Sequence, residues 1–345
     1  MENSMSRILI ETIVKKALRD IRDSPGRGIR NLVDMGLQFA GGRFQKNFFS
    51  TAQRMLKNES SAYYELVHDT VTHVDEKRLL SFGMKLGYNS CTAGARLIRA
   101  REKELGCNIP WTLALEIDPG AFAERGREYE AAIKAGNTLG IYAWMLFVPA
   151  RAQEVFPLVT ENPDSCFFLF CHAEEVTPEF VDTAASLDNL MVVIRYEEKA
   201  ADACALLRQA GLLYSVYYPY SQEDLAAIED GDLFCSLQEL HPVFSVLLAR
   251  PGCPEEIRSL AHQAVLKARE GQQYQTMLWE LYGDNRTIDE IISDDACSIY
   301  FNRDGDLYSW GERLEGDKDN LFRDPLSDIL QQALPKATVS TPQDQ

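Results

Sequence analysis

The stretch from residue 107 to residue 148, CNIPWTLALEIDPGAFAERGREYEAAIKAGNTLGIYAWMLFV, decides the fold class of this chain. It holds two short apolar runs, over 111–117 and 141–148, on either side of an amphipathic segment over 122–136. Both runs are apolar at successive positions, which is typical of parallel strands that are covered on both faces. The stretch therefore predicts a strand–helix–strand unit with two parallel strands in one sheet.

The same alternation continues towards the C-terminus as far as residue 282. Further apolar runs occupy 166–171, 190–196, 212–218, 243–248 and 276–282, with helical patterns such as 199–210 between them. Because no G-x-G-x-x-G follows any of these runs and no Walker A motif is present, a nucleotide-binding sheet is disfavoured. The repeated units predict an α/β fold, a partial or complete (β/α) barrel of the TIM type.

The flanking segments differ from this central part. Residues 1–106 show apolar side chains at helical spacing, so we expect an all-helical N-terminal region there. The barrel is expected over 107–333, and residues 297–310, CSIYFNRDGDLYSW, predict a terminal β-hairpin that closes it. The polar segment 334–345 is expected to be a disordered tail.

Charge excludes some partners and favours others. The net charge is −17, so general binding to nucleic acid is not expected. Residues 1–106 hold 18 Lys and Arg against 12 Asp and Glu, a net charge of +6, and the rest holds 17 against 40, a net charge of −23. The asymmetry indicates that the basic region contacts an acidic surface, which belongs to the rest of this chain, to a second copy or to a partner protein, although a solvated basic face explains it equally well. No apolar run of about 20 residues and no signal-peptide pattern is present, so we expect a cytoplasmic protein without a membrane partner.

Polar residues follow the predicted strands, where parallel barrels carry their functional groups. The sequence does not identify catalytic residues; the candidates are His172, which is the one histidine at such a position, and the carboxylates Glu116 and Glu280, either of which could act with it. The candidate ligand-binding residues at the other strand ends are Asp118, Arg151, Arg195 and Tyr218. Each of these side chains has an alternative role, because polar residues at strand ends also solvate the chain and cap helices.

Several stretches of this sequence, and the order in which they follow one another, resemble those of the bacterial radical S-adenosylmethionine enzymes. In these enzymes a catalytic barrel follows a helical N-terminal region. These stretches are NLVDMGLQF (31–39), LLSFGMKLGYNSCTAGARLIR (79–99), CNIPW (107–111), LALEIDPG (113–120), LGIYAWMLF (139–147), NPDSCFFLF (162–170) and SIYFNRDGDLYSW (298–310). The resemblance extends from about residue 10 to residue 333 and implies a barrel of the radical S-adenosylmethionine type. For the family it implies a [4Fe–4S] cluster on a C-x-x-x-C-x-x-C loop, together with S-adenosylmethionine.

This sequence departs from the family at the positions that carry the chemistry. No cysteine lies between Cys107 and Cys166, and the segment after Asp118 is too short for the family's cluster loop and helix. The family's G-G-E-P position is occupied here by VPAR (148–151), and its hairpin cysteine is missing from DLYSW (306–310). We therefore predict no cofactor and no metal, because a cluster of this kind needs three thiolates on one loop.

The sequence thus predicts a pseudoenzyme that binds a partner, either a second copy or an active radical S-adenosylmethionine homologue, or that binds the homologue's substrate. Two alternatives stay open. In the first alternative, the barrel is an enzyme that uses acid–base chemistry, with His172 and Glu116 or Glu280 as its catalytic groups. In the second, an iron–sulfur cluster is bound by a new set of ligands, Cys166, Cys171 and Cys253. Against the rebuilt cluster, Cys166 is expected at the wrong end of its strand.

Overall fold

The computed structural model describes residues 2–309 and 311–336, and its central element is one sheet. Among these residues the strands follow the order β10-β9-β8-β1-β2-β3-β4-β5-β6-β7. Their bounds are β1 Thr112–Glu116, β2 Ala143–Phe147, β3 Cys166–Cys171, β4 Leu190–Arg195, β5 Tyr214–Tyr220, β6 Phe244–Ala249, β7 Met277–Glu280, β8 Tyr300–Phe301, β9 Leu307–Ser309 and β10 Glu312–Arg313. The strands β1 to β7 pair in parallel with their sequence neighbours. All seven predicted strands are thus confirmed, with ends that differ from the predicted ones by at most two residues.

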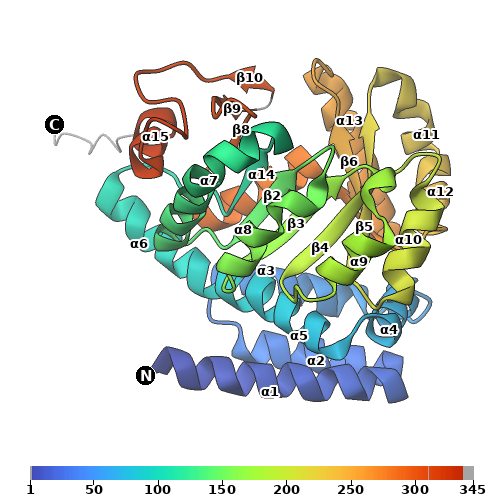
Figure 1. Cartoon of the computed structure of the whole chain (residues 1–345). Helices are drawn as coiled ribbons and strands as arrows, with labels where there is room; N and C mark the ends of the chain where they lie inside the picture. Colours follow the sequence, from blue (N-terminus) through green and yellow to red (C-terminus); the bar gives the residue numbers. More distant parts are fainter. Residues whose placement is uncertain (1, 310, 337–345) are drawn as a thin grey trace, which may run out of the picture.

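Helices connect the parallel strands and cover the outer face of the sheet (Figure 1). They are α7 Pro119–Leu139, η2 Ala152–Val155, α8 Phe156–Glu161, η3 Ala173–Glu175, α9 Pro178–Ala184, α10 Ala200–Gln209, η4 Gln222–Asp224, α11 Leu225–Glu229, α12 Asp232–Gln238 and α13 Glu255–Gly271. The helix α14, Leu281–Ser293, follows β7 and contacts the inner face of the sheet, where Asn285 meets Met145. The close approach of α7 to the sheet depends on Gly136, where an added Cβ would lie 2.5 Å from the Trp144 ring. The chain is therefore an α/β protein, as predicted.

The barrel is partial, because β7 and β10 lie at opposite ends of the strand order and do not pair in the described structure. The predicted hairpin is present, since β8 and β9 pair antiparallel, with Tyr300 opposite Tyr308. It does not close the barrel, however. Instead β8 pairs in parallel with β1, so the hairpin extends the sheet at its β1 edge. The strand β10, which has only two residues and both of them charged, was not predicted.

The N-terminal region is helical, as predicted, and lies below the sheet in Figure 1. Its elements are α1 Glu2–Asp23, α2 Pro25–Phe39, α3 Arg43–Met55, α4 Tyr63–His73, α5 Glu76–Met84, the π-helix η1 Lys85–Gly94 and α6 Ala95–Leu105. Buried side chains of α1, α2 and α4, together with Leu56 just after α3, form a small core of their own, consisting of Leu18, Ile21, Ile29, Leu56 and Val71.

Contacts between this region and the barrel reach the loops that precede the strands. Arg78 donates to the carbonyl oxygen of Ala185, and Lys85 pairs with Asp188 at 2.6 Å, both just before β4. The Asn89 side chain donates to the carbonyl oxygen of Asp164 before β3. The helical region therefore covers the amino ends of the strands, and their carboxyl ends lie on the opposite side.

The C-terminal part returns to the start of the barrel. The helix α15, Leu326–Ala333, precedes a short segment in which Pro335 pairs with Cys107 and Lys336 forms an ion pair with Glu102 at 2.9 Å. These contacts order residues 334–336, which the sequence placed in a disordered tail. The remainder of that prediction concerns residues 337–345, which lie outside the described residues.

Candidate functional site

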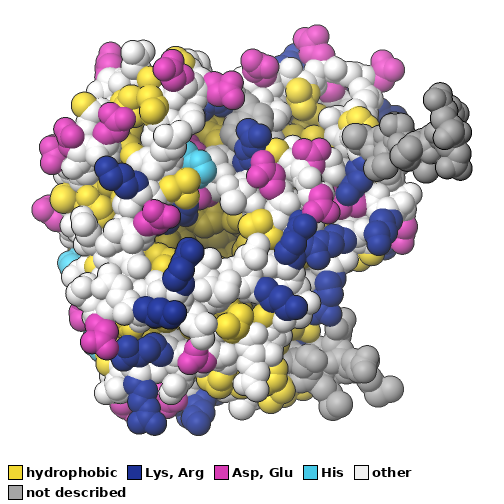
Figure 2. Space-filling model, turned by 180° about the vertical axis from the view of Figure 1, so that it is seen from behind, with side chains coloured by type: hydrophobic (Ala, Val, Ile, Leu, Met, Phe, Trp, Pro, Cys, Tyr) yellow, Lys and Arg dark blue, Asp and Glu magenta, His cyan; other side chains and the backbone are white. Residues whose placement is uncertain are grey.

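The two faces of the sheet differ in what covers them. Side chains that share the face of Trp144 pack beneath the outer helices and are almost all buried. The opposite, concave face retains partly exposed side chains, namely Ala114, Glu116, Phe147, Phe168, Arg195, Pro219, Phe244, Leu248, Met277, Trp279 and Tyr300. Strand alternation and the parallel register place these residues on one face. From behind, the molecule shows a hollow floored by hydrophobic side chains (Figure 2).

Aromatic rings make up much of this concave face. Phe147 and Phe170 stack with ring centroids 4.3 Å apart, and Tyr217 packs edge-on against Phe170 at 5.4 Å. On the neighbouring strands, Phe244 packs against Trp279 at 5.8 Å. Pairs of this geometry add packing energy of about 0.5–1.5 kcal/mol each beyond the apolar area that they bury. We call the rings of Phe147, Phe170, Tyr217, Phe244 and Trp279 the aromatic wall.

Helices cover only part of this face. Phe82 of α5 packs edge-on against Phe168, with ring centroids 5.5 Å apart. The Asn285 side chain of α14 contacts the sulfur of Met145 at 3.9 Å. Both contacts fall in the middle of their strands, so the part towards the carboxyl ends, including Phe147, is left partly open to solvent.

His172 lies directly after β3, and its partners differ from the predicted ones. Its Nδ1 lies 3.1 Å from Glu197 Oε1, and its Nε2 lies 3.5 Å from Arg195 Nη1. Glu197 also accepts a hydrogen bond from the Ala173 N–H at 2.8 Å. The carboxylate that contacts His172 therefore comes from the end of the adjacent strand and is Glu197, whereas the sequence analysis considered Glu116 or Glu280. Glu197 could have been predicted from its position just after β4, which is the strand next to β3 in the sheet.

Glu280 ends β7 and caps the helix that follows. Its Oε2 accepts the Gly283 N–H at 2.6 Å, and its Oε1 accepts the Tyr220 hydroxyl at 3.0 Å. The residue is only 1% exposed, and this burial raises the pKa of its carboxyl group to about 7, against the opposing effect of the two hydrogen bonds. An enclosed group that caps a helix is badly placed to meet a substrate, so its observed role is structural.

Glu116, in contrast, ends β1 on the concave face and is partly exposed. Burial raises its pKa, and the nearby charge of Arg303 in the hairpin turn acts in the opposite direction. Among the carboxylates considered, it is the one that faces the aromatic wall.

The other predicted binding residues mostly have structural partners. Asp118 caps α7 by accepting the Gly120 N–H at 2.8 Å, and the Tyr218 hydroxyl donates to Asp224 at 2.7 Å. Arg151 has a left-handed backbone with φ of 49° and pairs with Glu154 at 3.2 Å. Of the four residues, only Arg195 both lies on the concave face and contacts His172.

The residues present do not fit the iron–sulfur cluster that the resemblance implies. Only residues 117 and 118 separate β1 from α7, which leaves no room for a loop with three thiolates. Cys166 and Cys171 are the first and last residues of β3, so they lie about 16 Å apart and point to opposite faces. The structure therefore does not bring Cys166, Cys171 and Cys253 together. Among the described residues no group of three or more His, Cys, Asp or Glu side chains is arranged to hold a metal ion.

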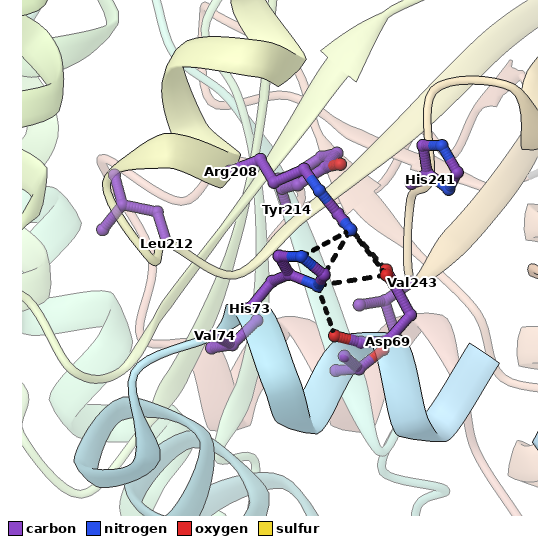
Figure 3. A pocket seen from close by; sticks show the side chains of 9 residues that line it. Asp69, His73, Val74, Arg208, Leu212, Tyr214, His241 and Val243 are labelled. Carbon is purple, nitrogen blue, oxygen red and sulfur yellow. Dashed lines mark hydrogen bonds and ion pairs between the residues drawn. The ribbon is translucent and has the colours of Figure 1, made fainter. Parts of the chain in front are cut away.

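A second cluster of polar side chains lies at the opposite end of the barrel (Figure 3). Arg208 of α10 forms two hydrogen bonds with Asp69 of α4, at 2.5 and 2.8 Å, and also contacts the His73 ring. Burial tends to raise the Asp69 pKa, but the hydrogen bond and charge of Arg208 outweigh this and lower it. The cavity beside these groups measures about 10 Å³, room for about one water molecule. The cluster therefore joins α4 to the barrel and is not a ligand site.

Comparisons with known proteins gave matches only among solved structures. No family model matches this sequence, and no curated protein matches it. The similar structures include Streptococcus suis SuiB bound to S-adenosylmethionine, with a TM-score of 0.49 and 11% identity over 69% of this chain and 68% of that chain. Another is SuiB bound to precursor peptide SuiA, with a TM-score of 0.47 and 13% identity over 69% of both chains. No described helix is long and apolar enough to cross a membrane.

Proposed function

We propose that this chain is a binding protein whose concave sheet face holds an apolar segment of a peptide, and that it does not carry out radical chemistry. The observation that carries this proposal is the partly exposed aromatic wall on the inside of an open half-barrel. Apolar surface of this kind is costly to leave in water, and concave apolar surface is typical of ligand sites.

The polar groups beside the wall favour a peptide as the occupant. Glu116 offers hydrogen-bond acceptors at one side of the face, and Arg195 with His172 offers donors at another. A peptide supplies both backbone N–H and C=O groups next to apolar side chains, so it can satisfy both sets. One SuiB structure holds a precursor peptide. The occupant proposed here rests on the chemistry of this face alone.

The absence of radical chemistry is proposed from the same segments that carry it in the enzymes that this sequence resembles. The short connection from β1 to α7 has no cysteine, and Asp118, at its end, serves as a helix cap. Without three thiolates close together, a [4Fe–4S] cluster has no ligands, and S-adenosylmethionine has no iron to bind.

Peptide binding is tested by titrating the protein with synthetic peptides that carry an aromatic–aliphatic segment, while the total tryptophan fluorescence, to which Trp279 contributes, is recorded. We expect Phe147→Ser to weaken binding roughly tenfold, because it removes about 1.5 kcal/mol or more of apolar contact. The control is Leu266→Ser, which removes an exposed apolar side chain of α13. Equal affinities for Phe147→Ser and the wild type would show that the wall is not the binding site.

The second half of the proposal needs a separate measurement. The protein is purified without oxygen, treated with iron and sulfide, and assayed for bound iron. It is then incubated with S-adenosylmethionine and a chemical reductant, and the formation of 5′-deoxyadenosine is measured. We expect no stoichiometric iron and no product. About four irons per chain together with product formation would overturn the pseudoenzyme proposal.

A second candidate function is favoured by the contact between His172 and Glu197. A histidine held by a carboxylate at a strand end is suited to move protons on a small anion, with Arg195 beside it to bind the charge. Small carboxylic acids should then raise the melting temperature of the wild type and not that of Arg195→Gln. If they raise neither, this candidate is excluded for that class of ligand.

A further inference from the structure

The helices α1, α2 and α3 carry most of the exposed large hydrophobic side chains of the described structure. These are Ile8 and Leu9 on α1, Phe39 on α2 and Phe48 on α3, with exposed fractions of 62%, 51%, 50% and 56%. Leu266 of α13, with 41%, is the fifth such residue in the part of the chain that the structure describes. Clustered apolar exposure is rare on monomeric proteins and marks interaction surfaces.

The packing of the three helices places these side chains at the same end. The turn at Ser24 folds α2 back along α1, and Gly28 lies so close to α1 that an added Cβ would be 2.6 Å from the Ile21 nitrogen. In the same way α3 folds back on α2, where Gly36 contacts the Phe49 ring. The second half of α2 therefore lies beside the first half of α1 on one side and beside α3 on the other.

This end of the helical layer lacks a core of its own. The first buried described residue of α1 is Ala17, α2 has none after Ile29, and α3 has none over its whole length. In Figure 1 the helices α1 and α2 form the outermost layer, and Figure 2 shows hydrophobic side chains along the same lower edge. The apolar side of these amphipathic helices is therefore only half covered by this chain.

The same helices carry the excess positive charge of the N-terminal region. Residues 1–57 hold 11 Lys and Arg against 5 Asp and Glu, a net charge of +6, whereas residues 58–106 hold 7 of each. Lys15 and Lys16 are exposed and lie two helical turns after Ile8 and Leu9, so each shares a face with an exposed apolar residue. A partner surface must therefore be both apolar and acidic.

A groove with these properties lies on the barrel, between α7 and α8. Its volume is about 510 Å³, and its apolar lining includes Phe122, Pro157 and Leu158. The charged residues that line it are Glu124, Glu130 and Glu161 against Arg127. In Figure 1 the helices α7 and α8 lie above α1 and α2.

We propose that the exposed end of α1–α3 docks into the α7–α8 groove of a second copy of this chain. Two copies of the basic helical layer would repel each other, so pairing of the layer with itself is disfavoured. Docking of the layer into the groove brings apolar side chains together and places Lys15 and Lys16 opposite carboxylates. Because the two surfaces differ, the contact is head-to-tail, and association continues beyond a dimer unless the copies close into a ring.

The test compares the size of the protein by sedimentation velocity at low and high salt. The wild type should associate at 50 mM salt and dissociate at 500 mM, where screening is stronger. Lys15→Glu/Lys16→Glu should weaken association at least tenfold, and so should Glu124→Lys/Glu161→Lys. An equimolar mixture of these two variants should associate again, because the reversed layer of one then meets the reversed groove of the other.

The matched control is Lys199→Glu/Lys267→Glu, which changes the net charge equally at exposed positions on α13 and just before α10. It should associate like the wild type. A monomeric wild type at 50 mM salt would overturn the proposal, and so would failure of the mixture to associate while circular dichroism shows both variants folded. Binding of the monomer to vesicles of anionic lipid, abolished by Lys15→Glu/Lys16→Glu, would assign the layer to a membrane surface instead.

Discussion

Replacing Glu280 with glutamine should stabilise the protein above pH 7 and change it little at pH 5. The carboxyl group of Glu280 releases its proton near pH 4.5 in an unfolded chain and near pH 7 in the folded protein. Between these values the folded protein binds more protons than the unfolded chain, so the free energy of unfolding falls as the pH rises. The stabilisation is complete below pH 4.5 and is lost above pH 7.

The size of the effect follows from the difference between the two pKa values. A shift from 4.5 to about 7 corresponds to about 3 kcal/mol of stability lost between pH 4.5 and pH 7. Glutamine does not ionise, and its carbonyl oxygen can still accept one of the two hydrogen bonds, from Gly283 or Tyr220. The other bond is weakened, which costs about 1 kcal/mol at every pH. The net gain of Glu280→Gln at pH 8 is therefore about 2 kcal/mol.

The assay is urea unfolding of wild type and variant at pH 5, 6, 7 and 8, followed by circular dichroism. Burial also raises the pKa of Asp289 to about 7, with the same sign of effect, so the wild type alone does not isolate Glu280. The difference between Glu280→Gln and wild type does isolate it, and Glu198→Gln, at an exposed carboxylate, serves as the control. If the difference between variant and wild type does not change with pH, the assignment of Glu280 as a buried, proton-binding cap is refuted.

Three further substitutions test how the chain is held together. Gly136→Ala should destabilise the fold by about 1–3 kcal/mol in urea unfolding, since its Cβ would overlap the Trp144 ring. Arg78→Met should cost about 3 kcal/mol, because buried carbonyl groups before β4 lose their donor, and limited proteolysis should then release the helical region first. Asp118→Ala should cost about 1 kcal/mol through the lost cap of α7 and leave peptide binding unchanged; a loss of binding without loss of stability would restore Asp118 as a ligand.

The strands of the half-barrel were predictable because burial on both sides leaves a continuous apolar run in the sequence. The hairpin was predictable from its turn residues, but its position was not. The pairing of β8 with β1 depends on contacts between residues at the beginning and at the end of the barrel sequence. Asp289, for example, accepts hydrogen bonds from the Trp111 N–H and from the Ser298 hydroxyl. No local pattern encodes a contact of this kind.

The site was predictable only in outline. Parallel topology gathers polar residues at the carboxyl ends, so His172 and Arg195 were found as candidates. Which carboxylate reaches His172 depends on the order and register of neighbouring strands, and the sequence analysis chose Glu116 or Glu280 in place of Glu197. The aromatic wall was missed because its residues are alternate members of apolar runs. Such runs do not reveal which face a helix leaves uncovered.

The strand order also constrains the sequence of events during synthesis. The first barrel strand, β1, finds one neighbour in β2 and the other in β8, which leaves the ribosome some 190 residues later. Until then the unpaired edge of an apolar strand is free to pair with another nascent chain. The partial barrel can assemble from β1 to β7 as it emerges, but its first edge is protected only when the hairpin arrives. A ribosome that stalls before codon 300 would therefore release a chain that is prone to aggregate, even though its parallel strands are complete.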